Sequence, residues 1–279
     1  MKVLVTGASG RIGGAVAARL TLNHQVTGLD LRAGPLTTEI ADVRDTGRIA
    51  ALLPGMDAVL HAASLHVPDL AARSAAEFRE VNVDATRRLL QAAGEAGIRR
   101  FVYTSTTSLY GDAMLPVDGA AAWVDESLEP RPRDVYDETK LAAEEACRIA
   151  ARAGLACTSL RVSRCFPEEP RLVAIYRLYR GVDAEDVAQA HELALDRQAG
   201  GFEPFNVSAP TPFRRADCRR LFEDAASVVL ERHPWAEVEF ARRGWQLPRS
   251  IDRVYVVDKA VAQLGYRPRN DFAALFRRP

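Results

Sequence analysis

Residues 2–13 read KVLVTGASGRIG, and this stretch decides the fold class of the chain. A short apolar, β-branched run leads into a turn that contains Gly7, Gly10 and Gly13, and apolar residues at helical spacing follow up to Leu20. Glycines let a backbone turn tightly and approach a pyrophosphate, whose negative charge is favoured at a helix N-terminus. The stretch therefore predicts a strand, a phosphate-binding turn and a helix.

The second expected strand, residues 25–30, ends on a carboxylate that suits the same ligand. Asp30 would accept hydrogen bonds from both ribose hydroxyls and repel a 2′-phosphate, which favours NAD over NADP. Arg11 and Ile12 begin the first helix and are expected to contact the cofactor. Arg11 and Arg32 are also near enough in the sequence to hold a 2′-phosphate, so NADP stays open as an alternative.

Two further pieces fit a bound dinucleotide. Asp42, followed by Val43, offers a carboxylate to the adenine amino group, with a helix cap as the alternative. His61 ends the third expected strand and is followed by Ala62 and Ala63, whose small side chains permit close approach of a cofactor. We expect His61 itself to be structural.

Strand-like and helix-like segments alternate through the first 165 residues. The expected strands are residues 2–6, 25–30, 58–61, 99–105 and 156–162, and the expected helices are 11–20, 75–96 and 137–153. Alternation of this kind predicts parallel strands joined by crossover helices, a Rossmann-type doubly wound α/β sheet.

The pattern changes after about residue 165, where prolines divide the chain into shorter pieces. Helices are expected at 186–195 and 215–230, and a strand at 203–207. We expect residues 1–165 to form the NAD-binding domain. Residues 166–279 are expected to form a small C-terminal substrate-binding lobe interleaved with the last sheet elements.

The composition excludes several other classes of protein. The 279 residues carry 37 basic and 37 acidic side chains, so no electrostatic footprint for nucleic acid exists. No apolar run suits a membrane span or a signal peptide. The four cysteines show no metal-ligand spacing and suggest reduced core thiols. A cytoplasmic protein with no metal, no nucleic-acid partner and no membrane contact is expected.

The candidate catalytic residues are a tyrosine and a lysine on one helix face. Tyr136 and Lys140 lie four residues apart, so their side chains share that face. A lysine ammonium and an oxidised nicotinamide both favour phenolate and would lower the tyrosine pKa toward that of a useful base. The hydroxyl cluster of residues 104–108 could hold the substrate oxygen beside the tyrosine.

These motifs resemble those of the extended short-chain dehydrogenase/reductases, the NAD-dependent epimerase/dehydratase family. TGASGRIG resembles the family's TGxxGxxG turn, YDETK its YxxxK motif and YTSTTSLYG its SSxxxYG stretch. The resemblance implies that Tyr136 is the base, that Lys140 lowers its pKa and holds the nicotinamide ribose, and that Thr106 orients the substrate oxygen. Ser105 is the second choice for that role, and Asn82 matches the asparagine that supports the lysine through the backbone.

Departures from the family pattern narrow the reaction. Thr106 is followed by Thr107 rather than by the Asp-Glu pair of sugar-nucleotide 4,6-dehydratases, so dehydration is not expected. Residues 168–180 are shorter than the usual nucleotide-binding insertion, which favours a smaller substrate. RVSRCFPEEPRLV is similar to a stretch of uronate dehydrogenases, and that likeness implies that Arg171 clamps a substrate carboxylate. The alternative for Arg171 is a solvated surface arginine.

The substrate contacts expected from the sequence are Ser64, Thr106, Thr107 and Arg171, although the loop around Ser64 could equally be plain packing. The leading hypothesis is an NAD-dependent oxidoreductase that moves hydride between NAD and a hydroxyl-bearing carbon of a sugar or sugar acid. One alternative is a nucleotide-sugar epimerase with tightly bound NAD, and another is a non-catalytic NAD(H)-sensing protein. The family resemblance also implies a homodimer formed through long helices.

Overall fold

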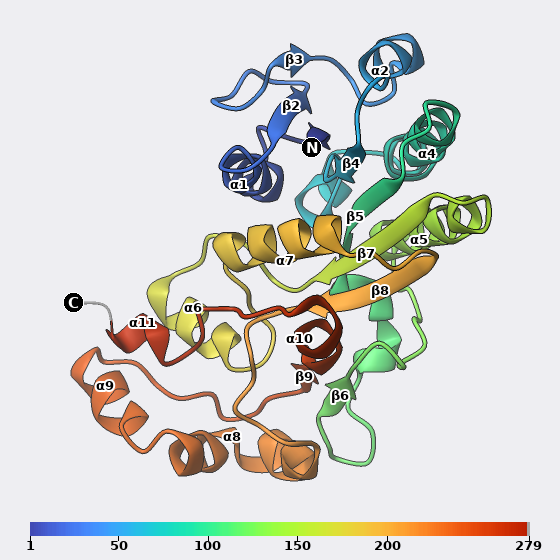
Figure 1. The fold of residues 1–279 in the computed structure, drawn as a ribbon. Coiled ribbons are helices and arrows are strands. Elements are labelled where there is room, and N and C mark those ends of the chain that lie inside the picture. The colour runs from blue at the N-terminus through green and yellow to red at the C-terminus, as the bar shows by residue number, and fades with distance from the viewer. Residues whose placement is uncertain (278–279) are drawn as a thin grey trace.

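A computed structural model describes residues 1–277, and within them seven strands form a parallel central sheet of order β3-β2-β1-β4-β5-β7-β8 (Figure 1). The strands are β1 (Lys2–Thr6), β2 (Gln25–Asp30), β3 (Glu39–Ile40), β4 (Ala58–His61), β5 (Arg100–Thr106), β7 (Ala156–Val162) and β8 (Phe202–Val207). Their order reverses beside β1, as in doubly wound sheets, so the predicted Rossmann-type fold class is confirmed.

Helices cover both faces of the sheet (Figure 1). Alternate residues of each strand point to opposite faces, so Val3 and Val5 belong to one core and Leu4 to the other. The first core is closed by α1 (Arg11–Leu20), α7 (Ala184–Asp196) and α10 (Asp258–Leu264). The second core is closed by α2 (Thr46–Leu52), α4 (Ala85–Glu95) and α5 (Val135–Arg152).

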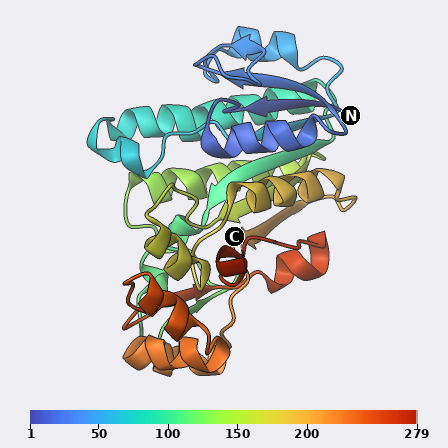
Figure 2. The same ribbon diagram turned by 90° about the vertical axis from the view of Figure 1, so that its left-hand side faces the viewer.

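A second group of elements packs beyond the edge of the sheet around its own core. It consists of α6 (Pro170–Arg177), α8 (Cys218–Arg232), α9 (Ala236–Arg242), α11 (Ala274–Arg277) and a parallel pair of short strands, β6 (Ala122–Val124) and β9 (Arg253–Tyr255). Figure 2 shows α8 and α9 in orange at the bottom, at the opposite end from the blue N-terminal strands. We call this group the lobe. The chain crosses between its two parts, because β6 joins the lobe while α7 and β8 join the sheet.

Most elements with a strong sequence pattern lie where that pattern placed them. The expected long helix 75–96 is interrupted: α3 (Ala75–Arg79) and α4 are joined by a π-helical turn at Glu80–Asp84. The expected helix 215–230 begins with a 3-10 turn, and its backbone is non-helical at Asp224 (φ −151°, ψ 76°). Within the described residues, no helix combines the length and apolar character that crossing a bilayer requires.

Candidate active site

A cleft of about 690 Å³ opens at the carboxyl ends of the parallel strands. Its walls follow β1, β2, β4, β5 and β7, which is where doubly wound sheets bind their ligands. Most residues chosen from the sequence line it: Gly7, Gly10, Arg11, Ile12, Gly13, Asp30, Asp42, Val43, Ala62, Ala63, Ser64, Ser105, Thr106, Tyr136 and Lys140. Asn82, Thr107 and Arg171 are not among its lining residues.

The glycine turn has no room for side chains. Gly7 adopts φ +76°, and a Cβ there would lie 2.8 Å from the backbone nitrogen of Ala63. A Cβ on Gly13 would lie 2.0 Å from the carbonyl oxygen of Gly7. The backbone of the turn is therefore bare at the N-terminus of α1 and packs directly on the end of β4. This cradle fits a dinucleotide pyrophosphate.

Asp30 is held at the cleft by two backbone amides. Its carboxylate accepts hydrogen bonds from the Ser9 nitrogen and from the Arg32 nitrogen, each at 3.0 Å. The Ser9 side chain donates to the Arg32 carbonyl at 2.7 Å and thereby ties the glycine turn to the end of β2. A carboxylate fixed beside the turn is the group that a ribose diol requires.

Asp42 is paired with an arginine that sequence reasoning missed. Arg44 donates to the Asp42 carboxylate from Nη2 at 2.6 Å and from Nε at 3.0 Å, and these bonds hold the pKa of Asp42 below its usual range. The alternative role for Asp42, a helix cap, is wrong, because Asp45 caps α2 by accepting from the Arg48 nitrogen at 2.9 Å. Asp42 and Arg44 both line the cleft.

Tyr136 and Lys140 enter the cleft from the first turns of α5. The helix starts after Asp134, whose side chain accepts a hydrogen bond from the Asp137 nitrogen. Lys140 is buried, and its Nζ donates to the Thr104 carbonyl at 2.6 Å and lies 4.3 Å from the Tyr103 ring centroid. The lysine thus bridges α5 and the end of β5.

Burial dominates the protonation of this pair. It raises the pKa of Tyr136 to about 12, against the opposing effect of a hydrogen bond with Thr106. It lowers the pKa of Lys140 to about 7, and Glu144 opposes that change. Lys140 is not among the groups that shift the Tyr136 pKa in this geometry, so the expected lowering of that pKa by the lysine is not found here.

The hydroxyl cluster separates into residues inside and outside the cleft. Thr106 ends β5 and accepts a hydrogen bond from the Ser108 nitrogen at 3.1 Å. Ser105 also lines the cleft, and its buried Oγ has no hydrogen-bond partner within residues 1–277. Thr107 is buried at the start of the next 3-10 turn and does not line the cleft, so the structure does not place it as a substrate contact.

Asn82 supports a loop. It lies in the π-helical turn before α4, and its side chain exchanges hydrogen bonds with the Leu65 backbone at 2.8 Å and 2.9 Å. Its Nδ2 also donates to Thr139, the neighbour of Lys140 on α5, at 3.1 Å. Its own carbonyl accepts from Thr86 at 2.8 Å. Asn82 therefore ties the cleft loop after β4 to α5, whereas the lysine itself donates to the Thr104 carbonyl.

His61 is structural, as the sequence suggested. Its two ring nitrogens lie 2.7 Å from Thr6 Oγ1 and 2.9 Å from Thr86 Oγ1. The ring is fully buried, and burial, assisted by the charge of Lys140, lowers the pKa of His61 to about 3. It is neutral at physiological pH and links β1, β4 and α4.

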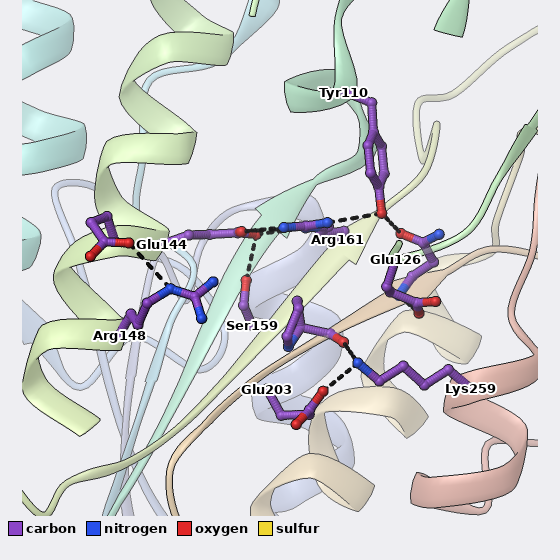
Figure 3. Close-up of polar contacts among 11 residues, drawn as sticks. Tyr110, Glu126, Glu144, Arg148, Ser159, Arg161, Glu203 and Lys259 are labelled. Carbon is purple, nitrogen blue, oxygen red and sulfur yellow. Dashed lines mark hydrogen bonds and ion pairs between the residues drawn. The ribbon is translucent and has the colours of Figure 1, made fainter. Parts of the chain in front are cut away.

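A buried ion pair fixes α5 against the sheet. Arg161 of β7 donates from Nη2 to Glu144 of α5 at 2.8 Å and from Nη1 to the Tyr110 hydroxyl at 2.9 Å (Figure 3). Ser159 donates to the same glutamate at 2.8 Å, and the Tyr110 hydroxyl donates to Asn206 of β8. These bonds hold the helix that carries Tyr136 against β7, the strand that pairs with β5 in the sheet.

Arg171 lies on α6 and lines neither the cleft nor the second cavity described below. The expected carboxylate clamp is therefore not brought to the site. Arg164 and Phe166, which follow β7, lie at or beside the cleft instead. Their position at the carboxyl end of a parallel strand was the signal that could have singled them out.

Comparison with known proteins identifies the family. The model of the NAD dependent epimerase/dehydratase family matches residues 3–172, more than half of the chain. The chain belongs to this family. The predicted membership, the Rossmann-type fold and the NAD cofactor of the family are confirmed.

Proteins described as dehydrogenases and epimerases resemble the chain. An L-arabinose 1-dehydrogenase (NAD(P)(+)) from Haloferax volcanii is 33% identical over 98% of each chain. A 3-beta-hydroxysteroid dehydrogenase from Mycolicibacterium neoaurum is 34% identical, but the match covers 52% of this chain and 42% of that protein. The chain spans 62% of a Bacillus subtilis protein described as an uncharacterized UDP-glucose epimerase.

Solved structures share the fold of this chain at lower sequence identity. An Agrobacterium tumefaciens short-chain dehydrogenase/reductase superfamily protein with bound NAD superposes with a TM-score of 0.72 at 23% identity, covering 99% of this chain and 94% of that one. A Thermotoga maritima UDP-glucose 4-epimerase gives 0.73 at 19% identity, covering 98% and 96%. In this chain, the positions of the glycine cradle and of Asp30 fit NAD, the cofactor of the family.

Proposed function

We propose that the protein is an NAD-dependent dehydrogenase that oxidises a carbinol of a sugar or sugar acid. The observation that carries the proposal is the convergence of Tyr136, Lys140 and Thr106 on the cleft that also holds the glycine turn and Asp30. The match to an L-arabinose dehydrogenase along nearly the full length of both chains supports a sugar substrate.

Tyr136, Thr106 and Lys140 each have a separate role in the proposed reaction. Tyr136 removes the proton from the substrate hydroxyl. Thr106, which is hydrogen bonded to Tyr136, orients the oxygen of that hydroxyl. Lys140 holds the nicotinamide ribose, and its ammonium group stabilises the phenolate. Bound NAD supplies a hydride acceptor and a positive charge that favours that phenolate.

The proposal is tested by mixing the protein with NAD and a panel of free aldoses and uronic acids while NADH absorbance is followed. Sustained NADH formation with wild type and its loss in Tyr136→Phe, with NAD binding retained, would support it. No NADH formation with any sugar, together with release of bound NAD when the protein is denatured, would favour a nucleotide-sugar epimerase instead. Full turnover by Tyr136→Phe would refute the assigned base.

We further propose that the lobe lies on the substrate side of the site, since its α6 lines the cavity beside the cleft, and that the protein is a cytoplasmic homodimer. The four cysteines are free and buried, which suits a reducing compartment. Ile149 is 58% exposed on α5 and offers an apolar contact for a second copy. Light scattering should show a dimer that Ile149→Asp weakens, and a wild-type monomer at micromolar concentration would refute the dimer.

A further inference from the structure

A second cavity of about 220 Å³ adjoins the cleft. The two share Arg11, Phe166 and Pro167 as walls, so a ligand in one lies next to a ligand in the other. Its other walls come from the segment after β7, from α6 and from the segment leading into α7. We call it the side cavity. It extends the cleft on the side of the segment that follows β7.

The side cavity combines aromatic faces with a fixed pair of charges. The Arg164 guanidinium lies 5.2 Å from the Phe166 ring centroid and 5.4 Å from that of Tyr176, and its Nε donates to Glu168 at 2.6 Å. The backbone of Arg164 is hydrogen bonded on both sides to residues 180–182. The Arg164–Glu168 pair therefore holds hydrogen-bond donors and acceptors in a fixed position beside the ring face of Phe166.

Two of the three arginines that line the side cavity are paired with carboxylates of its own wall. Arg164 is paired with Glu168, and Arg177 is paired with Asp183 at 2.9 Å. The third, Arg11, begins α1 and also lines the cleft, and we assign its charge to the cofactor pyrophosphate. An anionic ligand would meet two carboxylates whose arginines are already engaged, and like charges brought together weaken binding.

A hydroxyl-bearing ligand suits this arrangement. Buried Nη1 of Arg177 has no hydrogen-bond partner within residues 1–277, and a hydroxyl oxygen can accept from it. Free guanidinium hydrogens of Arg164 and free lone pairs of Glu168 suit neighbouring hydroxyl groups, which both donate and accept. The volume is below the range of about 300–1,000 Å³ for drug-sized ligands, so the side cavity suits part of a small ligand such as one sugar ring.

We propose that the side cavity binds the end of a neutral, unactivated monosaccharide remote from the reacting carbon, with Arg164 and Glu168 as ligands of adjacent hydroxyls and Phe166 against the C–H face. The inference rests on the proposed function and narrows its substrate to neutral free sugars. It places specificity at Arg164 and Glu168 and assigns no role to Arg171.

The test compares matched sugars that differ only in a carboxylate, D-galactose with D-galacturonate and D-glucose with D-glucuronate. Wild type should prefer the neutral member by about tenfold or more in kcat/KM. Glu168→Gln should move the ratio toward the uronate by about tenfold, because it removes a negative charge and frees Arg164. Arg164→Gln should raise KM for the neutral sugar with little change in kcat. Arg171→Gln is the matched control and should leave the ratio within about twofold.

Binding to the protein loaded with NADH gives a readout independent of turnover, since an alcohol cannot be oxidised in that complex. Calorimetric dissociation constants for the same sugar pairs should shift in Glu168→Gln as kcat/KM does. A shift in binding without any NADH formation from NAD would leave the inference standing and refute the proposed function. A wild-type preference for uronates abolished by Arg171→Gln, an unchanged ratio in Glu168→Gln, or no sugar binding would overturn the inference.

Discussion

Glu144→Gln should destabilise the protein by about 3–5 kcal/mol, because it leaves a buried guanidinium without a counter-charge. The side chains of Arg161 and Glu144 are 5% and 2% exposed, and their closest nitrogen and oxygen are 2.8 Å apart. The glutamate also accepts from Arg161 Nε at 3.1 Å and from Ser159 at 2.8 Å. Glutamine keeps one acceptor oxygen but presents a donor to these donors.

The adjacent residue provides the control. Glu145 is paired with Arg148 at 3.2 Å, and these side chains are 55% and 44% exposed. Figure 3 shows Arg148 on the same helix as Glu144. Because solvent screens an exposed pair, Glu145→Gln should cost less than about 1 kcal/mol. The free energy of unfolding would be obtained from urea titrations followed by circular dichroism. Losses that agree within about 1 kcal/mol for the two variants would refute the assignment.

The same variant should change the pH dependence of the reaction. Glu144 lies one helical turn after Lys140 and raises the pKa of that lysine against the larger effect of burial. Glu144→Gln should therefore lower the Lys140 pKa further below about 7, so the ammonium is lost at a lower pH. The alkaline limb of the kcat profile should move to lower pH in Glu144→Gln and stay in place in Glu145→Gln. An unmoved limb in both would contradict this coupling.

Three further outcomes are expected. Asp30→Ala should weaken NADH binding about tenfold and reduce discrimination against NADPH, because a charged acceptor is lost. Fluorescence titration with both cofactors would measure the two affinities. An unchanged preference for NADH would contradict the role of the Asp30 carboxylate in cofactor choice. Asn82→Ala should speed hydrogen exchange in the loop at Leu65 and raise KM, because the variant cuts the loop's side-chain anchor; unchanged exchange would contradict this. His61 and His191 are buried with pKa values lowered to about 3 and about 4 by burial. The unfolded chain binds their protons first, so stability present above about pH 6.5 should fall as pH drops toward 4, and urea midpoints constant over this interval would refute it.

The sequence by itself determined the sheet and the phosphate turn. β1, α1, β2, β4 and β7 lie at the predicted bounds, because buried parallel strands and their helices carry strong apolar periodicity. The glycines are equally local, since Gly7 needs a positive φ and Gly13 needs a bare Cα. The positive φ and the contact between Gly13 and Gly7 are set within a few residues of chain, so the local sequence pattern reveals them.

Only the tertiary structure decided which polar residues meet. Thr107 looked equivalent to Thr106 in the hydroxyl cluster, but a 3-10 turn buries it away from the cleft. The short elements β6 and β9 carry too little pattern to be predicted and find each other across more than 120 residues of chain. Arg171 and Arg164 are both arginines near one strand end, yet only Arg164 faces a cavity. Side-chain placement of this kind depends on packing between distant segments, which no local pattern encodes.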